Sequence, residues 1–311
     1  MPKSFTNINK LIKFLKIDKQ NQKKILLKSD FPLLLPYSLA KKIKKNDLSD
    51  PIFRQFVPLI DETFKNPEYI KDPLCEKQFK RSKLLKKYNS RALIITTHAC
   101  SMHCRYCFRK YFERSSNQNF DKEIDLIKKD KTITEIILSG GDPLILSNSS
   151  LESLLKKLDE ISHIKIIRFH TRYIISNAER IDQNFIKILK NIKKQIIFVF
   201  HINHPKEIDS SVIKATKRLK KQNILLFNQS VLLKGINDDF ETLKNLNLKL
   251  IETGVVPYYL HQLDKVEGSK HFEVPIKKGK ELIKLLQENL SGYMVPKYVR
   301  EIPNKKSKSL I

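Results

Sequence analysis

From residue 91 onward, short runs of β-branched and other apolar residues alternate with longer amphipathic stretches. The runs predict β-strands and cover residues 91–99, 134–140, 164–170, 195–202, 224–232 and 255–263. Between them, stretches such as SLESLLKKLDEI and NFIKILKNIKK repeat apolar residues every three or four positions, which predicts helices. Alternation of strands and helices indicates an α/β fold with a parallel sheet.

Six strand–helix units are too many for a small sandwich and two fewer than a complete (βα)8 barrel contains. We therefore predict a partial (βα)6 barrel over residues 91–290. In barrels, functional residues gather at the carboxyl ends of the strands. Cys100, Arg172 and Asp264 each follow a predicted strand, and Gly140 to Asp142 lie at the end of the second one, so we expect the active site at that end.

Two further regions flank the predicted barrel. Residues 1–90 contain amphipathic pieces such as INKLIKFLKI, broken by proline-containing segments, which predicts a helical N-terminal region. Residues 291–311 follow a further helical stretch, KGKELIKLLQEN, and form a short C-terminal segment. The chain has neither a repeat of fixed period nor a Gly/Ser linker.

Composition narrows the class of protein. A hydrophobic fraction of 41% with 30% charged residues excludes wholesale disorder. No apolar run is long enough to span a membrane, and the first residues lack the apolar core of a signal peptide, so we expect a cytoplasmic protein. The net charge of +27 would suit a nucleic-acid partner, but the lysines are scattered and do not alternate with aromatic residues. This pattern favours a solvated coat of lysines.

The segment CSMHCRYC carries the strongest chemical signal, with Cys100, Cys104 and Cys107 close together after the first predicted strand. Three thiolates from one loop suit an iron–sulfur cluster, whereas a structural zinc site takes four protein ligands. Three ligands on a four-iron cluster would leave one iron open for chemistry. The fourth cysteine, Cys75, is interpreted as a small buried hydrophobic residue.

This cysteine spacing, on a loop after the first strand of a βα chain, resembles the radical S-adenosylmethionine (SAM) superfamily. The segment SGGDP, which follows the second predicted strand, resembles the glycine-rich element of that superfamily. The resemblance implies that a [4Fe–4S] cluster binds the three cysteines. It also implies that the SGGDP element receives the methionine amino group of SAM, through Ser139, Gly140, Gly141 and Asp142.

Longer stretches resemble the lysine 2,3-aminomutase family, in particular its shorter bacterial branch. These stretches are CRYCFRKYF, SGGDPL, HINHPKEI, NQSVLLKGIND, PYYLHQLDKVEGSKHF and SGYMVPKYVREI. The resemblance implies an isomerase that converts L-α-lysine to (R)-β-lysine for modification of elongation factor P. It further implies SAM, a [4Fe–4S] cluster and pyridoxal 5′-phosphate (PLP) as cofactors, and a flavodoxin- or ferredoxin-type electron donor. Oligomeric state is left open.

In the family, PLP is bound by a lysine near the end of the chain, several residues after an acidic residue. Counting from Glu301 in REIPNKKSKSLI assigns this role to Lys308. Ser309 and Leu310 follow it where the family usually has Thr-Pro. Lys305 and Lys306 are the alternative positions.

The resemblance assigns further roles. Arg109 matches the arginine that binds the substrate carboxylate, and Arg91 matches one that binds the cofactor phosphate. Lys87 stands where relatives often have a second arginine, an exchange that phosphate binding tolerates. Asp264 and Glu301 match the acidic pair that binds the distant ε-ammonium of lysine.

Alternative functions stay open at this stage. One is a radical SAM enzyme that acts on RNA, which the net charge of +27 would suit. Another is an aminomutase of a different amino acid, although the acidic pair would repel a glutamate side chain. A third is a non-catalytic relative that keeps only the fold. His201 and His204 could suggest a metal site, but at strand-end spacing we expect hydrogen-bonded packing.

Overall fold

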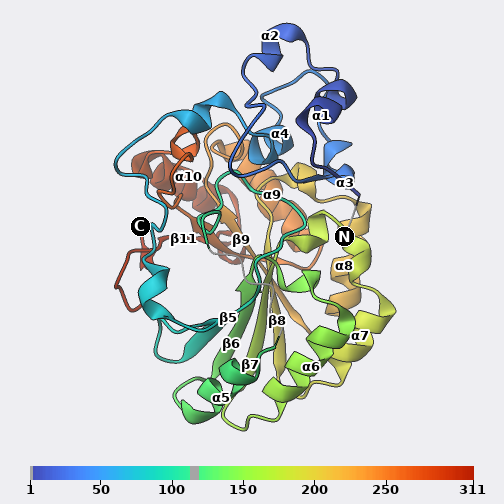
Figure 1. Ribbon diagram of the computed structural model, residues 1–311, viewed down its shortest axis with the longest axis vertical. Helices are drawn as coiled ribbons and strands as arrows, with labels where there is room; N and C mark the ends of the chain where they lie inside the picture. Colours follow the sequence, from blue (N-terminus) through green and yellow to red (C-terminus); the bar gives the residue numbers. More distant parts are fainter. Residues whose placement is uncertain (1–2, 113–118) are drawn as a thin grey trace.

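The computed structural model describes residues 3–112 and 119–311 (Figure 1). Within the described chain, one sheet has the strand order β12-β11-β10-β9-β8-β7-β6-β5-β4-β3. Six consecutive strands pair in parallel and overlap the six predicted ranges, which confirms them: β5 (Arg91–Thr97), β6 (Glu135–Gly140), β7 (Ile166–Thr171), β8 (Gln195–His201), β9 (Leu225–Val231) and β10 (Val256–His261). The predicted α/β fold of the partial-barrel type is therefore correct.

Six described helices each connect one parallel strand to the next and pack on the outside of the sheet (Figure 1). They are α5 (Asp121–Lys129), α6 (Asn148–Asp159), α7 (Gln183–Lys190), α8 (Ser210–Lys220), α9 (Phe240–Glu252) and α10 (Ile276–Asn289). In α6, for example, the side chain of Ser147 caps the first turn, and Leu151, Leu154, Leu155 and Leu158 form the buried face. In α6, the spacing of apolar residues that predicts the helix therefore also gives the face that packs on the sheet.

The sheet is wider than the sequence predicts. At one edge, β11 (Lys297–Arg300) pairs in parallel with β10, and β12 (Ser309–Leu310) pairs antiparallel with β11. At the other edge, β4 (Leu84–Leu85) pairs antiparallel with β5, and β3 (Lys80–Arg81) pairs with β4. Strands of two residues are too short to carry a recognisable alternation of apolar and polar positions.

The N-terminal region is only partly helical, so the prediction of helix over residues 1–90 is too broad. Its helices are α1 (Ile8–Leu15), α2 (Lys19–Gln22), α3 (Tyr37–Ala40) and α4 (Pro51–Phe56), with a small sheet of β1 (Ser4–Phe5) and β2 (Leu35–Pro36). Later residues form the 3₁₀ helices η1 (Ile60–Thr63) and η2 (Glu76–Phe79) before β3 and β4.

The N-terminal region also shares its hydrophobic core with the barrel. Leu11, Leu15 and Phe53 belong to the same buried cluster as Phe169 and Phe198 of the sheet. Burial of these side chains therefore fixes the region against the barrel. No described helix combines the length and the apolar character needed to cross a membrane.

Candidate active site

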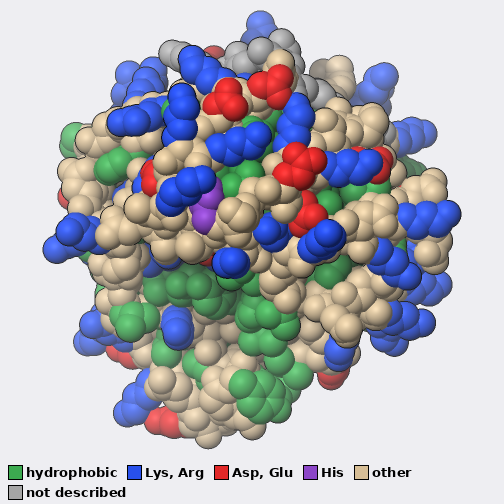
Figure 2. Space-filling view, turned by 90° about the horizontal axis from the view of Figure 1, so that it is seen from below, with side chains coloured by type: hydrophobic (Ala, Val, Ile, Leu, Met, Phe, Trp, Pro, Cys, Tyr) green, Lys and Arg blue, Asp and Glu red, His purple; other side chains and the backbone are tan. Residues whose placement is uncertain are grey.

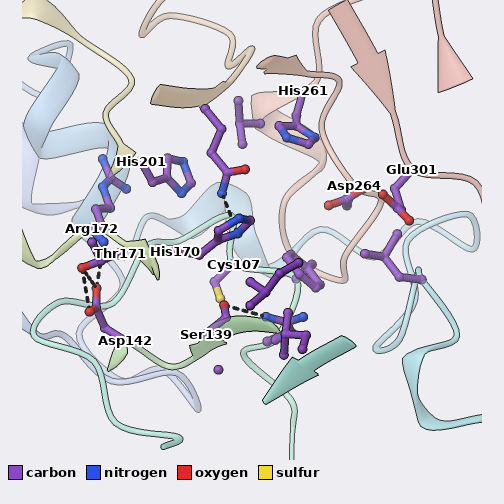
Figure 3. Close-up of a pocket in the computed structure, with 18 of the residues that line it drawn as sticks. Cys107, Ser139, Asp142, His170, Thr171, Arg172, His201, His261, Asp264 and Glu301 are labelled. Atoms are coloured by element: carbon purple, nitrogen blue, oxygen red, sulfur yellow. Dashed lines mark hydrogen bonds between the residues drawn. The ribbon is translucent and has the colours of Figure 1, made fainter. Parts of the chain in front are cut away.

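A cavity of about 410 Å³ opens at the carboxyl ends of the parallel strands (Figure 3). Strands β5 to β10, the cysteine loop and the C-terminal segment all contribute to its lining. Every site residue predicted from the sequence lines this cavity: Arg91, Cys100, Cys104, Cys107, Arg109, Ser139, Gly140, Gly141, Asp142, Asp264, Glu301 and Lys308. The fold thus brings residues from opposite ends of the barrel sequence to one place.

The cysteine loop is anchored by a buried arginine. Arg105 Nε donates to Glu62 Oε1 at 2.8 Å, and its Nη1 donates to the carbonyl of Phe31 at 2.6 Å. The main chain closes a turn from Cys107 N to Cys104 O at 3.0 Å. Residues of the N-terminal region therefore hold the loop in place over the end of β5.

The three thiols lie in one another's electrostatic field. Burial raises the pKa of Cys107 to about 11, and the neighbouring thiolate of Cys104 adds to the shift. Burial also raises the pKa of Cys100, again with contributions from the other two cysteines. Ionisation of these thiols therefore needs a positively charged partner, as the irons of an iron–sulfur cluster provide.

Among the described residues, no three metal-ligating side chains converge on a point that one metal ion would occupy. In a four-iron cluster each thiolate binds a different iron, so its ligands do not have to meet at one point. The cysteine loop therefore fits a cluster by its donor atoms and by its place at the cavity wall.

The glycine-rich turn packs directly against the backbone that leads into the cysteine loop. Gly141 N donates to Thr97 O at 2.6 Å, and Asp142 N donates to Ala99 O at 2.9 Å. A Cβ atom on Gly141 would lie 2.1 Å from Ala99 O, and one on Gly140 would lie 2.5 Å from Thr97 O. The two glycines are thus required by the close approach of two strand ends.

Replacing Gly141 with alanine should destabilise the protein by about 1–3 kcal/mol, because the new methyl group overlaps backbone that cannot move freely. Chemical denaturation would measure the loss, and iron content after reconstitution would show whether the adjoining cysteine loop is displaced. Gly292→Ala is the matched control, since a Cβ there meets no atom within 4 Å. Equal stability of the two variants would contradict the close approach.

Asp142 joins the same turn to the next strand. Its carboxylate accepts hydrogen bonds from Thr171 Oγ1 at 2.7 Å, from Arg172 N at 2.7 Å and from Leu144 N at 3.0 Å. Burial raises the pKa of this carboxyl to about 6, against the effect of those hydrogen bonds. Asp142 therefore fixes the position of the turn between β6 and β7.

Arg109 is oriented by a partner that sequence reasoning missed. Its Nε and Nη2 atoms donate to the two carboxylate oxygens of Glu76, at 2.8 and 2.7 Å. This pair uses one edge of the guanidinium and leaves the Nη1–Nη2 edge for another carboxylate. Nη1 lies 3.5 Å from Ser139 Oγ, at the cavity wall. Nothing in the sequence around Glu76 distinguishes it from other acidic residues of the N-terminal region.

Lys308 reaches the cavity because β12 holds the end of the chain against β11, with Ser309 opposite Arg300 and Leu310 opposite Val299. Its Nζ donates to Glu301 Oε2 at 2.6 Å. The alternative positions Lys305 and Lys306 are exposed and do not line the cavity.

The two predicted acidic residues differ in their surroundings. Glu301 accepts hydrogen bonds from Lys308, from Lys87 Nζ at 2.7 Å and from Tyr88 OH at 2.5 Å. Burial opposes its ionisation, but the charge of Lys308 and these hydrogen bonds lower the pKa of Glu301 to about 2. Lys87, expected beside a phosphate, thus pairs with Glu301.

Asp264 lies on the same side of the cavity as Glu301, away from Arg172 (Figure 3). No hydrogen bond or ion pair joins its carboxyl group to another described side chain. Burial raises the pKa of Asp264 to about 7, although the charge of Lys308 opposes this shift. A half-buried carboxyl group without a hydrogen-bonded partner among the described side chains is suited to a cationic ligand.

Two further arginines line the same cavity. The guanidinium of Arg91 lies over the ring of Tyr88, 4.1 Å from its centroid. Arg168, on β7, also lines the cavity and pairs with Glu135 at 3.0 Å. Sequence reasoning missed Arg168, which lies within a predicted strand and not after one. Together with Lys87, these side chains would suit an anionic group.

The histidines behave as packing residues. His204 Nδ1 accepts a hydrogen bond from Lys206 N at 3.0 Å, which confirms the expected packing role. His201 lies 3.5 Å from Tyr106 OH, and burial lowers its pKa to about 3, so that its ring is neutral. His170, His201 and His261 line the cavity.

Comparison with known proteins gives one family model and several relatives that agree with one another. Residues 94–246 match the model of the radical SAM superfamily. The chain is 38% identical over 315 residues to an L-lysine 2,3-aminomutase of Buchnera aphidicola subsp. Baizongia pistaciae, covering 99% of this chain and 93% of the relative. It is 37% identical to an L-lysine 2,3-aminomutase of Escherichia coli, covering 98% of this chain and 91% of that relative.

A solved structure supports the fold alone. The radical SAM methyltransferase from Sphaerobacter thermophilus superposes with a TM-score of 0.53 at 14% identity, covering 70% of this chain and 68% of that chain.

The matched region begins within β5 and includes the cysteine loop and the glycine-rich turn. The relatives match almost the entire chain. A [4Fe–4S] cluster and SAM are therefore cofactors of this enzyme. The chain belongs to the lysine 2,3-aminomutase family of radical SAM isomerases.

Proposed function

We propose that this enzyme converts L-α-lysine to (R)-β-lysine by moving the amino group from C2 to C3. The observation that carries the proposal is the convergence of the cysteine loop, Lys308 and Asp264 on one cavity. The names of three relatives, each an L-lysine 2,3-aminomutase, support lysine as the substrate.

In this proposal Cys100, Cys104 and Cys107 hold the cluster, and Lys308 holds PLP. When bound, the cluster with SAM supplies a carbon radical that abstracts hydrogen, and PLP supplies a π-system through which the amino group moves. Arg91 and Arg168, both at the cavity wall, are the cations available to the phosphate.

The chain's own residues bind the two ends of lysine. The free Nη1–Nη2 edge of Arg109 would take the substrate carboxylate, because Glu76 occupies only the other edge. The half-buried carboxylate of Asp264 would take the ε-ammonium. Glu301, which lies beside Asp264, would add its negative charge to the same end of the cavity, although it stays hydrogen-bonded to Lys87 and Tyr88.

Apolar side chains form part of the wall of this cavity. Leu74, Leu85, Leu93 and Leu263 lie among its lining residues. Exclusion of water protects a reactive carbon centre from unproductive reactions and strengthens the charge interactions at Arg109 and Asp264.

The pH dependence of kcat/KM should follow the ionisation of Asp264, and below about pH 6 that of Asp142 as well. Since the pKa of its carboxyl is raised to about 7, the ionised fraction falls as the pH drops below 7. We expect kcat/KM for lysine to decline by about tenfold per pH unit on the acid side. Glu301 adds no such dependence, because its pKa of about 2 leaves it ionised throughout. A kcat/KM that stays constant between about pH 5.5 and 7 would argue against this role for Asp264.

Cys75 provides a test of the cluster ligands, since it does not line the cavity. Cys75→Ala should keep its full iron content and SAM cleavage after anaerobic reconstitution. Cys104→Ala should lose most of both, because one of the three cluster ligands is missing. Iron and sulfide analysis together with electron paramagnetic resonance would show whether each variant holds the cluster. Loss of the cluster in Cys75→Ala would overturn the assignment.

The proposal also covers the compartment, the electron donor and the fate of the product. We infer a cytoplasmic enzyme with a flavodoxin- or ferredoxin-type electron donor, whose product serves the modification of elongation factor P. Mass analysis of elongation factor P, with and without this enzyme in the same cells, would test the destination of the product.

Anaerobic reconstitution with iron, sulfide, SAM and PLP, followed by incubation with L-lysine or L-glutamate, tests the activity. We expect β-lysine from lysine, no turnover of glutamate, and no product when PLP is omitted. The alternative, action on RNA, would instead give salt-sensitive RNA binding and no PLP absorption band. On the face shown in Figure 2, Lys and Arg side chains are spread out with acidic ones among them, which gives no continuous basic patch there.

A further inference from the structure

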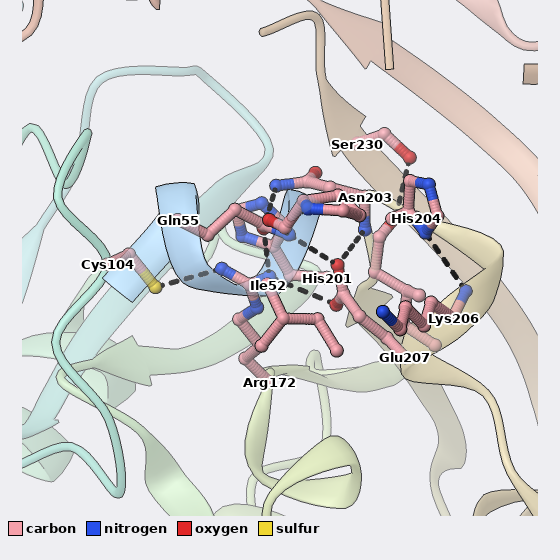
Figure 4. A network of polar contacts seen from close by, with 12 residues as sticks. Ile52, Gln55, Cys104, Arg172, His201, Asn203, His204, Lys206, Glu207 and Ser230 are labelled. Carbon is pink, nitrogen blue, oxygen red and sulfur yellow. Dashed lines mark hydrogen bonds and ion pairs between the residues drawn. The ribbon is translucent and has the colours of Figure 1, made fainter. Parts of the chain in front are cut away.

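A buried network of polar side chains connects the cysteine loop to β7 and β8 (Figure 4). At its centre, Arg172 follows the end of β7 and is only 6% exposed. Its Nη1 atom donates to Cys104 Sγ at 3.0 Å and also to Tyr106 OH. Its Nη2 atom donates to Gln55 Oε1 at 2.5 Å and to Glu207 Oε2 at 3.0 Å. The guanidinium thus touches a cysteine sulfur while the rest of its fork is fixed.

The partners of Arg172 are themselves held by one another. Gln55 Nε2 donates to Glu207 Oε1 at 2.9 Å. Asn203 Nδ2 donates to Gln55 Oε1 at 3.0 Å and to Tyr106 OH at 2.6 Å. These side chains are buried and come from α4, the cysteine loop and the end of β8. A network of this kind leaves the guanidinium little freedom to turn away from the sulfur.

The charges in the network are arranged in a line. Glu207, which is fully buried, balances the guanidinium on the side away from Cys104. The positive charge therefore faces the sulfur, and a negative charge stands behind it. The hydroxyl and amide groups of Tyr106, Gln55 and Asn203 carry no charge of their own.

We propose that Arg172 is a positioning residue that hydrogen-bonds the Cys104 thiolate and raises the reduction potential of the cluster. This inference rests on the proposed ligation of the cluster by Cys104. Reduction adds one negative charge to the cluster, and a fixed cation in contact with a ligand sulfur stabilises that added charge. Hydrogen bonds to cluster sulfurs and the local net charge are established determinants of such potentials.

The sign of the effect follows for each charged member of the network. Without the positive charge of Arg172, the reduced cluster is less stable, so the potential becomes more negative. Without the negative charge of Glu207, the reduced cluster is more stable, so the potential becomes less negative. Damage to the fold alone would not move the two variants in opposite directions.

The experiment is a redox titration of the reconstituted holoenzyme, followed by electron paramagnetic resonance, for wild type, Arg172→Gln, Arg172→Lys and Glu207→Gln. At a fixed poise, the ratio of reduced to oxidised cluster should fall about tenfold in Arg172→Gln, a midpoint shift of about 59 mV for one electron. Arg172→Lys keeps the charge without the fork and should shift less. Glu207→Gln should shift the other way.

Arg218→Gln is the matched control. It removes an exposed arginine of α8 whose Nη1 donates to the carbonyl of Ile181 at 2.9 Å, and Arg218 does not line the cavity. The midpoint potential of the cluster in Arg218→Gln should equal that of wild type.

Each outcome decides between the possibilities. Opposite shifts in Arg172→Gln and Glu207→Gln support the inference. Unchanged potentials in variants with full iron content overturn it, while the proposed function stands. If Arg172→Gln does not fold, the sign in Glu207→Gln decides, and no shift there overturns the inference. A wild-type protein that holds no cluster overturns the proposed ligation and this inference with it.

Discussion

Replacing Lys308 with alanine should abolish the formation of β-lysine and the absorption band of bound PLP, while leaving the iron content unchanged. The amine of Lys308 lines the cavity, and no other lysine near the C-terminus does so. A lysine that binds PLP covalently cannot be replaced by a side chain without an amine. We therefore expect a loss of turnover of at least about a thousandfold, a size typical when a covalent catalytic residue is removed.

Lys305→Ala and Lys306→Ala are the controls, because both side chains are exposed. Their turnover should stay close to wild type. Reduction of the wild-type enzyme with borohydride, followed by peptide mapping, should place the pyridoxyl group on Lys308. Finding it on Lys305 or Lys306 would show that the C-terminal segment has a different register.

Replacing Asp264 with asparagine should lower kcat/KM for lysine by roughly 30- to several-thousand-fold. Removing one partner of a buried charge pair typically costs about 2–5 kcal/mol, and the carboxyl of Asp264 is the group proposed to bind the ε-ammonium. Cleavage of SAM without lysine should change little, since Asp264 takes no part in the cysteine loop. Steady-state kinetics and a SAM cleavage assay would separate the two effects.

Asp125→Asn is the control for loss of a negative charge, because Asp125 is exposed on α5. An Asp264→Asn variant that turns over lysine as fast as Asp125→Asn would contradict the role of Asp264. Glu301→Gln is less selective, since it also removes a hydrogen-bond partner of Lys308 and Lys87.

Most of the barrel can be predicted from the sequence because its strands and helices each have a strong local pattern. The run QIIFVFHI, for example, becomes β8, and SLESLLKKLDEI becomes most of α6. The short strands β3, β4 and β12 could not be predicted in this way, since each has only two residues. Their pairing depends on neighbours that lie far away in the sequence.

The cysteine loop and the glycine-rich turn were predictable from the spacing of their residues and the resemblance to a known family. Counting from Glu301 predicts Lys308 as the lysine that binds PLP, and both residues line the cavity. What spacing could not predict are the side-chain pairs. Glu76 and Arg109 are 33 positions apart, and Arg172 and Cys104 are 68 apart. Only the fold brings such residues into contact.

The conversion of L-lysine labelled with ¹⁵N at the 2-amino group tests the central claim most directly. The reconstituted enzyme, with SAM, PLP and a reductant under anaerobic conditions, should yield β-lysine with the label on C3, detected by NMR. Intramolecular transfer from C2 to C3 is the reaction that the cavity with Arg109, Asp264 and Lys308 is proposed to support. Active cleavage of SAM with the label still on C2 of unchanged lysine would contradict the account.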